Sequence, residues 1–385
     1  MKVNPKVLEQ EIAVFGESGS GKTVLLSSFY GATQEPEWLR ESLFNVVAER
    51  TKQGTHLHRN YLGMKNSAAL PKQNQFNWDS YAFSVKLKNT GGKASKKKQF
   101  DAVRLVWHDY PGEWFEQDAN GPEEAARRVD AFRSLLGSDV ALLLVDAQRL
   151  IDNEGEEERY LKSLFSNIRN VLLSLKDDLL DDGNKLVEFP RIWMISLSKA
   201  DLLPDMDIYA FRDLIVEKAC DEVDELRRVL EEMVQGSNAL SIGEDFMLLS
   251  SANFEPNAIL LEERIGVDLV LPTAAILPFE RHVRWASNKT LPNEVASSIL
   301  QGAAELASAL VDNKRTWLPQ GMNTILRVVV RTGVLDEAVN LANDALANAN
   351  TNARTKRDTL RATLTQFKMD LNEGEQNRVL LRSAK

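Results

Sequence analysis

The chain has 385 residues, of which 43% are hydrophobic and 27% charged, a composition typical of a globular protein with one or two domains. Its formal net charge of −9 argues against nucleic acid as the main partner, because an acidic surface repels a polyanion. No apolar run approaches the about 20 residues of a membrane-spanning helix, and no apolar stretch opens the chain. We therefore expect a cytoplasmic protein without a membrane span or a secretory signal.

Short apolar runs that end at polar or turn residues recur along the first two thirds of the chain and predict six strands. These strands cover residues 11–15, 81–87, 102–107, 140–145, 192–197 and 246–249. Apolar residues at helical spacing predict helices over 122–136, 156–175 and 209–234. Strands that alternate with helices predict an α/β fold with a mostly parallel sheet covered on both faces. A lysine-rich segment over 91–98 suggests that the second and third strands form an antiparallel hairpin.

The pattern changes after Leu271, where prolines interrupt the chain and no further strand is predicted. We place a boundary near Trp285, between a large α/β domain over 1–285 and a helical C-terminal appendage over 286–385.

The appendage shows helical spacing of apolar residues in three places, 295–310, 328–346 and 360–371. We interpret it as a packing or partner surface that could also mediate a homo-oligomer.

A glycine-rich segment separates the first strand from a helical pattern that opens at Val24. It reads Gly16-Glu17-Ser18-Gly19-Ser20-Gly21-Lys22-Thr23 and fits GxxxxGK(S/T). Glycines let backbone N–H groups surround phosphates, and the N-terminus of the following helix attracts them. We expect Lys22 to reach the β- and γ-phosphates and the Thr23 hydroxyl to bind Mg²⁺. The segment predicts that residues 16–24 bind a nucleoside triphosphate.

The strand over 102–107 leads into Trp107-His108-Asp109-Tyr110-Pro111-Gly112. A carboxylate at this position, Asp109, can hold Mg²⁺ through water. The small Gly112 would let its backbone N–H approach the γ-phosphate and stabilise developing charge.

Two later strands end in segments that suit recognition of guanine. Ser198-Lys199-Ala200-Asp201 follows the strand over 192–197, and Asp201 could accept from the ring N–H and from the exocyclic amine of guanine. Adenine offers no such pair of donors. Ser250-Ser251-Ala252 follows the strand over 246–249, where a backbone N–H of Ser251 or Ala252 could donate to the guanine carbonyl.

These four motifs, in this order, resemble those of the translation-factor and Ras-like P-loop GTPases. The resemblance covers about residues 8–255. It implies a three-layer P-loop sandwich with strand order 2-3-1-4-5-6, one strand antiparallel, and GTP or GDP with Mg²⁺ at the carboxyl ends of the strands. The runs 15–23 and 107–114 and the long inserts also resemble bacterial double-GTPase proteins, which implies a place in a multi-protein conflict or defence system.

Two positions depart from the usual motifs. Ser198 stands where these GTPases carry Asn or Thr; its shorter hydroxyl could tie the base loop to the P-loop but reaches the base less well, so we expect weaker guanine binding. Glu113 takes the place of the water-orienting residue, usually Gln or His. Its carboxylate can accept a hydrogen bond from water but cannot donate one to the γ-phosphate. We keep two interpretations of Glu113, a catalytic residue and a mobile, solvated one.

The segment over 31–78 is much longer than an ordinary switch loop. Thr51 and Thr55 are the candidates for the switch threonine that binds Mg²⁺. Arg50 and Arg59 could neutralise charge in the transition state, and an arginine from a partner is an equal alternative.

Together these features predict a GTP-hydrolysing switch in which water attacks the γ-phosphate. Lys22, Mg²⁺ held by Thr23, and the backbone of Gly112 would stabilise the charge that develops. Hydrolysis would release the segments over 31–78 and 112–120, whose state a protein partner reads. Two alternatives stay open: an ATP-hydrolysing P-loop enzyme, and a nucleotide-binding scaffold with little or no hydrolysis.

Overall fold

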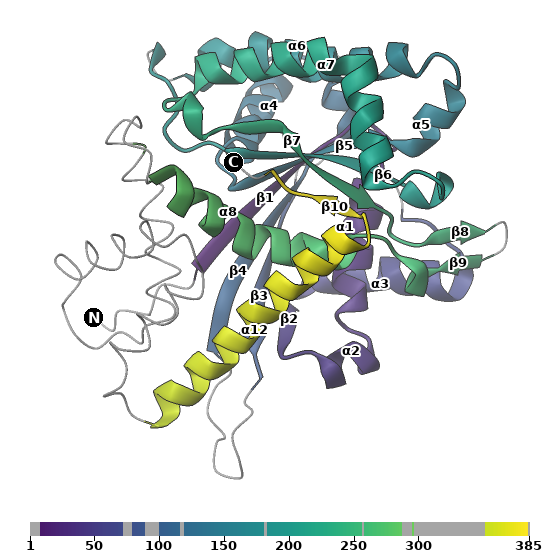
Figure 1. The fold of residues 1–385 in the computed structure, drawn as a ribbon, viewed down its shortest axis with the longest axis vertical. Coiled ribbons are helices and arrows are strands. Elements are labelled where there is room, and N and C mark those ends of the chain that lie inside the picture. The colour runs from purple at the N-terminus through teal and green to yellow at the C-terminus, as the bar shows by residue number, and fades with distance from the viewer. Residues whose placement is uncertain are drawn as a thin grey trace.

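A single sheet covered by helices on both faces forms the centre of the protein (Figure 1). The computed structural model describes residues 8–71, 79–88, 100–115, 119–180, 183–255, 258–286, 295 and 351–383. The sheet has eight strands in the order β10-β7-β6-β5-β1-β4-β3-β2. The predicted α/β sandwich is therefore confirmed.

The middle of the sheet is parallel and its margins are antiparallel. The parallel strands are β1 (Leu8–Phe15), β4 (Phe100–Asp109), β5 (Val140–Asp146), β6 (Ile192–Ser198) and β7 (Ser241–Leu249). Antiparallel pairs join β2 (Phe44–Ala48) to β3 (Asp79–Leu87), β3 to β4, and β10 (Leu380–Leu381) to β7. A separate small hairpin pairs β8 (Asn253–Glu255) with β9 (Ala258–Leu260). Every residue of β5 and β6 is buried, as expected of strands covered on both faces.

All six predicted strands are present, as β1, β3, β4, β5, β6 and β7. They lie side by side in the predicted order 2-3-1-4-5-6, and β3 pairs antiparallel with β4 as the hairpin prediction requires. The lysine-rich segment between them lies outside the described residues. Strands β2 and β10 extend this sheet at its two edges and were not predicted.

Two hydrophobic cores pack against the two faces of the sheet. One face carries α4 (Pro122–Leu135), α5 (Ala147–Asp152), α6 (Glu157–Leu179) and α7 (Ile208–Met233). The other face carries α1 (Lys22–Ala32), α3 (Thr51–Ser67), α8 (Val270–Ala286) and α12 (Thr351–Gln376). Neighbouring residues of β1 alternate between the cores, with Ile12 and Val14 in one and Ala13 and Phe15 in the other. Figure 1 shows these helix layers on either side of the sheet.

The segment over 31–78, which we interpreted as a long switch loop, contains regular structure. It holds α2 (Pro36–Glu41), β2 and α3. Phe44 and Val46 of β2 and Leu57 of α3 belong to the core of the α1 face. This part of the chain is thus an integral layer of the fold.

The described end of the C-terminal segment shares the core of the sheet. Helix α12 packs against α8, and its Leu364, Phe367 and Leu371 are buried in that core. The rings of Phe367 and Phe44 lie 5.3 Å apart, while Leu380 in β10 pairs with Met247 of β7. The predicted helix over 360–371 is therefore present within α12; those over 295–310 and 328–346 lie outside the described residues, except Val295. The boundary near Trp285 stays a prediction.

No helix in the described part of the chain is long and apolar enough to cross a membrane.

Candidate nucleotide-binding site

A pocket of about 390 Å³ lies at the carboxyl ends of the central strands. It brings together most of the residues that the sequence motifs predicted to bind nucleotide. The predicted residues that line it are Ser18, Gly19, Ser20, Gly21, Lys22, Thr23, Val24, Asp109, Gly112, Glu113, Ser198, Lys199, Asp201 and Ser251. The other predicted residues, Gly16, Glu17 and Ala252, do not line it.

The P-loop joins β1 to α1 and curves around the side chain of Lys22. Gly19 and Gly21 have φ angles of 81° and 88°, a left-handed conformation that residues with a Cβ adopt only at a cost. The Lys22 ammonium is buried and donates to the carbonyls of Gly16 at 2.7 Å and of Glu17 at 3.1 Å. The positive charge is therefore held inside the curve of the loop, beside the pocket.

The segment after β4 packs directly on the P-loop. The Tyr110 hydroxyl accepts from the Gly16 N–H at 2.8 Å, and the complete burial of Tyr110 raises its pKa well above the ordinary value. A Cβ added to Gly112 would lie 2.4 Å from the Ser18 nitrogen, which is closer than atoms can approach. The Ser18 hydroxyl also donates to the Glu113 carboxylate at 2.8 Å. Glu113 is therefore held against the P-loop in this structure.

The oxygen atoms of Thr23 and Asp109 suit Mg²⁺. The Thr23 hydroxyl donates to the Asp109 carboxylate at 3.3 Å, and both residues line the pocket. Mg²⁺ prefers oxygen ligands and is commonly held by one or two side chains together with substrate phosphates. Among the described residues, no group of three or more His, Cys, Asp or Glu side chains could form a metal site by itself. The side chains present fit a Mg²⁺ ion shared with a phosphate ligand.

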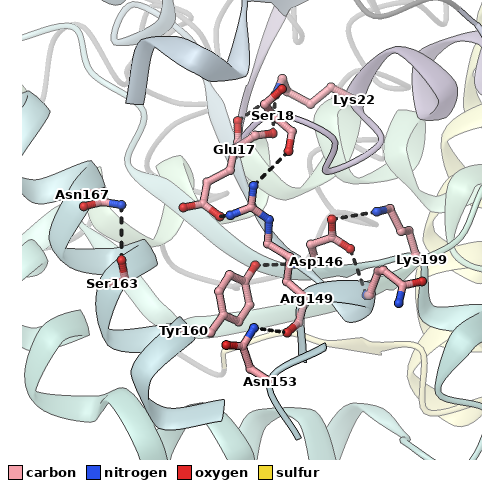
Figure 2. Close-up of polar contacts among 12 residues, drawn as sticks. Glu17, Ser18, Lys22, Asp146, Arg149, Asn153, Tyr160, Ser163, Asn167 and Lys199 are labelled. Atoms are coloured by element: carbon pink, nitrogen blue, oxygen red, sulfur yellow. Dashed lines mark hydrogen bonds and ion pairs between the residues drawn. The ribbon is translucent and has the colours of Figure 1, made fainter. Parts of the chain in front are cut away.

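The side of the pocket that the motifs predict to recognise the base centres on Asp201. Its carboxylate accepts from the Ser250 hydroxyl and, at 3.4 Å, from the Phe254 N–H. Lys199 adopts a left-handed φ of 55°, and its ammonium forms an ion pair with Asp146 at 2.7 Å (Figure 2). These contacts fix the loop after β6 beside the end of β7.

One expectation about this side needs correction. The Ser198 hydroxyl donates to the Val145 carbonyl at 3.2 Å, so it ties the loop to β5 and not to the P-loop. The Ser250 hydroxyl contacts Asp201, Ser251 lines the pocket, and Ala252 is fully buried. The expected hydrogen bond from a backbone N–H of Ser251 or Ala252 to guanine stays a prediction.

The sequence model of the family described as Double-GTPase 2 matches residues 10–242, which is more than half of the chain. The chain belongs to the Double-GTPase 2 family. No curated protein matches it.

Several solved structures show low similarity to this family member. One is the SRb-GTP/SRX complex of the signal recognition particle receptor from Chaetomium thermophilum, with 18% identity and a TM-score of 0.34, covering 64% of this chain and 93% of that chain. Roco2 RocCORdC bound to GDP, from Methanosarcina barkeri, has 12% identity and a TM-score of 0.23, and the match covers 95% of this chain and 69% of that chain. Elongation factor SelB from Methanococcus maripaludis, in complex with the GTP analogue GppNHp, has 10% identity and a TM-score of 0.20. That match covers 64% of this chain and 31% of that chain.

The switch candidates of this Double-GTPase 2 protein lie away from the pocket. Thr51, Thr55, Arg50 and Arg59 all have exposed side chains at or on α3, and none of the four lines the pocket. The 31–78 segment instead contributes Leu70 and Pro71 to the lining.

Two residues that the sequence motifs did not reveal connect the site. Asp146 ends β5 and pairs with Lys199, and Arg149 on α5 pairs with the P-loop residue Glu17. The sequence signal for such a partner is the acidic Glu17 within a phosphate-binding loop, because a buried carboxylate there requires a nearby cation.

Proposed function

We propose that this protein binds GTP with Mg²⁺ in the pocket and hydrolyses its γ-phosphate. One observation carries the proposal: Lys22 and Asp201 line the same pocket, so a single nucleotide can touch both. The ammonium suits a triphosphate, and the carboxylate suits the paired N–H donors of guanine. Membership of a GTPase family supports the same conclusion.

The phosphate end of the pocket supplies the groups that γ-phosphate transfer to water needs. When bound, Mg²⁺ would neutralise charge on the phosphate oxygens, and Thr23 and Asp109 are the side chains that would hold it. Lys22 and the N–H of Gly112 would offset the negative charge that develops on the γ-phosphate. Glu113, which lines the pocket, could accept a hydrogen bond from the attacking water.

A scaffold that holds nucleotide with little hydrolysis is the second candidate. The contact between Ser18 and the Glu113 carboxylate favours it, because this contact engages the carboxylate that would otherwise face water. Phosphate release from GTP that is lost in Lys22→Ala would argue for the hydrolase. If Lys22→Ala releases phosphate as fast as the wild type does, the release comes from a contaminating enzyme. That result would support the scaffold.

We also propose that a protein partner reads the nucleotide state, within a multi-component bacterial conflict or defence system. The support is that both candidate switch segments contribute to the pocket lining, Pro71 from one and Glu113 from the other. Capture of the same protein from a bacterial extract with a non-hydrolysable GTP analogue, but not with GDP, would support this role. Equal capture in both states would count against it.

A titration with three nucleotides tests the base preference that separates GTP from ATP. Wild-type protein should bind GTP at least about tenfold more tightly than ATP, because a hydrogen bond to a charged acceptor contributes about 1.5–3 kcal/mol. Asp201→Asn should lose affinity for GTP and gain it for xanthosine triphosphate, whose carbonyl matches the amide donor. The matched control is Asp205→Asn, since Asp205 is exposed nearby and does not line the pocket. Equal binding of GTP and ATP by the wild type would refute guanine selectivity.

A further inference from the structure

The P-loop carries a buried carboxylate, which is unexpected in a segment that binds phosphates. Glu17 is the second residue of the loop and is only 5% exposed. A carboxylate shielded from water is costly unless a cation accompanies it, and its charge would also repel a triphosphate. The loop therefore needs a compensating positive charge besides Lys22.

Arg149 supplies this charge from a different part of the chain. Its guanidinium lies 2.7 Å from the Glu17 carboxylate and also donates to the Ser18 carbonyl at 3.2 Å. Figure 2 shows Arg149 reaching from below to both P-loop residues. A planar guanidinium can bind two acceptors at once in a fixed geometry, which an ammonium does less well.

The short helix α5 holds Arg149 in place. The helix begins directly after β5, and the Asp146 carboxylate caps it by accepting from the Gln148 N–H at 3.0 Å. Because β5 is fully buried and pairs with β1, the start of α5 is fixed beside the P-loop. Arg149 therefore lies on a short helix whose start is anchored to a buried central strand.

The bond to the Ser18 carbonyl has a consequence for the phosphate site. In a planar trans peptide the C=O and the following N–H point in opposite directions. A guanidinium that holds the Ser18 carbonyl therefore turns the Gly19 N–H the other way, and Gly19 lines the pocket.

We propose that Arg149 is a positioning residue of the phosphate site. It neutralises Glu17 and fixes the peptide between Ser18 and Gly19, so that the loop presents a donor and no net negative charge to the phosphates. This inference rests on the proposed binding of GTP in the pocket.

A double-mutant cycle on Glu17 and Arg149 tests the inference through affinities for GTP and GDP. Arg149→Gln leaves the Glu17 carboxylate without its cation and should weaken GTP binding by about tenfold or more. This loss is smaller than for a fully buried ion pair, because Arg149 is partly exposed. GDP should lose less, because it carries less negative charge. Glu17→Gln should leave GTP binding unchanged or tighter, and the double variant should bind GTP more tightly than Arg149→Gln alone.

Two further variants separate this role from a general loss of structure. Arg149→Lys keeps the charge without the planar fork and should fall between wild type and Arg149→Gln. Arg159→Gln is the matched control, because Arg159 is an exposed arginine on α6 that pairs with Glu156. Thermal melting of each variant shows whether it is folded.

The outcomes that overturn the inference are distinct from failure of the proposed function. If wild type binds GTP but Glu17→Gln weakens binding as much as Arg149→Gln does, the ion pair is only structural and the inference is wrong. Equal loss of GTP and GDP affinity in a folded Arg149→Gln would also contradict it. A wild-type protein that binds no nucleoside triphosphate would refute the proposed function and this inference with it.

Discussion

Gly112 offers the sharpest single test of how the segment after β4 meets the P-loop. Its backbone lies against Glu17 and Ser18 so closely that an added Cβ would be 2.4 Å from the Ser18 nitrogen and 2.5 Å from the Glu17 carbonyl carbon. Both neighbours are backbone atoms of the loop, which cannot rotate away as a side chain would. The substitution Gly112→Ala must therefore separate the two segments.

The size of the separation follows from the contact distances. Ordinary van der Waals contact for a Cβ begins at 3.4 Å, so the Gly112 backbone would have to move by about 1 Å. A misplacement of about 1 Å can reduce a reaction rate by about 100-fold. Nucleotide affinity should change much less, because Lys22 and Asp201 are untouched. We expect Gly112→Ala to bind GTP but to hydrolyse it about 100-fold more slowly.

Single-turnover release of phosphate from bound GTP measures this effect, with melting temperature as a check on folding. Gly63→Ala is the matched control: a Cβ there would lie 3.5 Å from its nearest neighbour, and the residue lies within α3. A folded Gly112→Ala protein that hydrolyses GTP within about threefold of the wild-type rate would refute the steric reasoning.

Three further predictions concern catalysis and stability. Glu113→Gln adds an N–H that can donate to the γ-phosphate, and it should raise the single-turnover rate of GTP hydrolysis by about tenfold. A lower rate in this variant would contradict the prediction. Burial raises the pKa of Tyr110 and Tyr160, so both stay protonated in the folded protein at pH values where the unfolded chain ionises. The free energy of unfolding in urea should therefore fall as pH rises above about 10, by up to about 1.4 kcal/mol per pH unit for each tyrosine, and the slope should be shallower in Tyr160→Phe. Phe367→Ala should destabilise the fold by about 3 kcal/mol, whereas Met369→Ala, at a side chain 58% exposed, should have little effect.

The central strands and the P-loop could be predicted because their signals are local. Each parallel strand is a short apolar run bounded by polar residues, and the P-loop motif follows one of them within a few residues. β2 was missed although its sequence, FNVVA, is mostly apolar, because the whole segment over 31–78 was interpreted as a switch loop. β10 has two residues and pairs with Met247 and Phe246 far back in the chain, so no local pattern could reveal it.

The parts of the site that were missed depend on contacts between distant segments. Glu17 and Arg149 meet only because β5 lies beside β1. Ser250 and Asp201 likewise meet only because β7 lies beside β6. A motif thus predicted the chemistry of each segment, whereas the sheet decides the exact residue that reaches the neighbouring segment.

The turn after β5 links the two halves of the pocket. Asp146 pairs with Lys199 of the loop after β6 and also caps α5, and Arg149 of that same helix pairs with Glu17 of the P-loop (Figure 2). Because α5 has only six residues, a change that tilts it would move both contacts together. Residues that share such a connection do not act additively. The affinity for GTP therefore cannot be divided into independent contributions from the phosphate and base ends, and substitutions at Asp146 should change both.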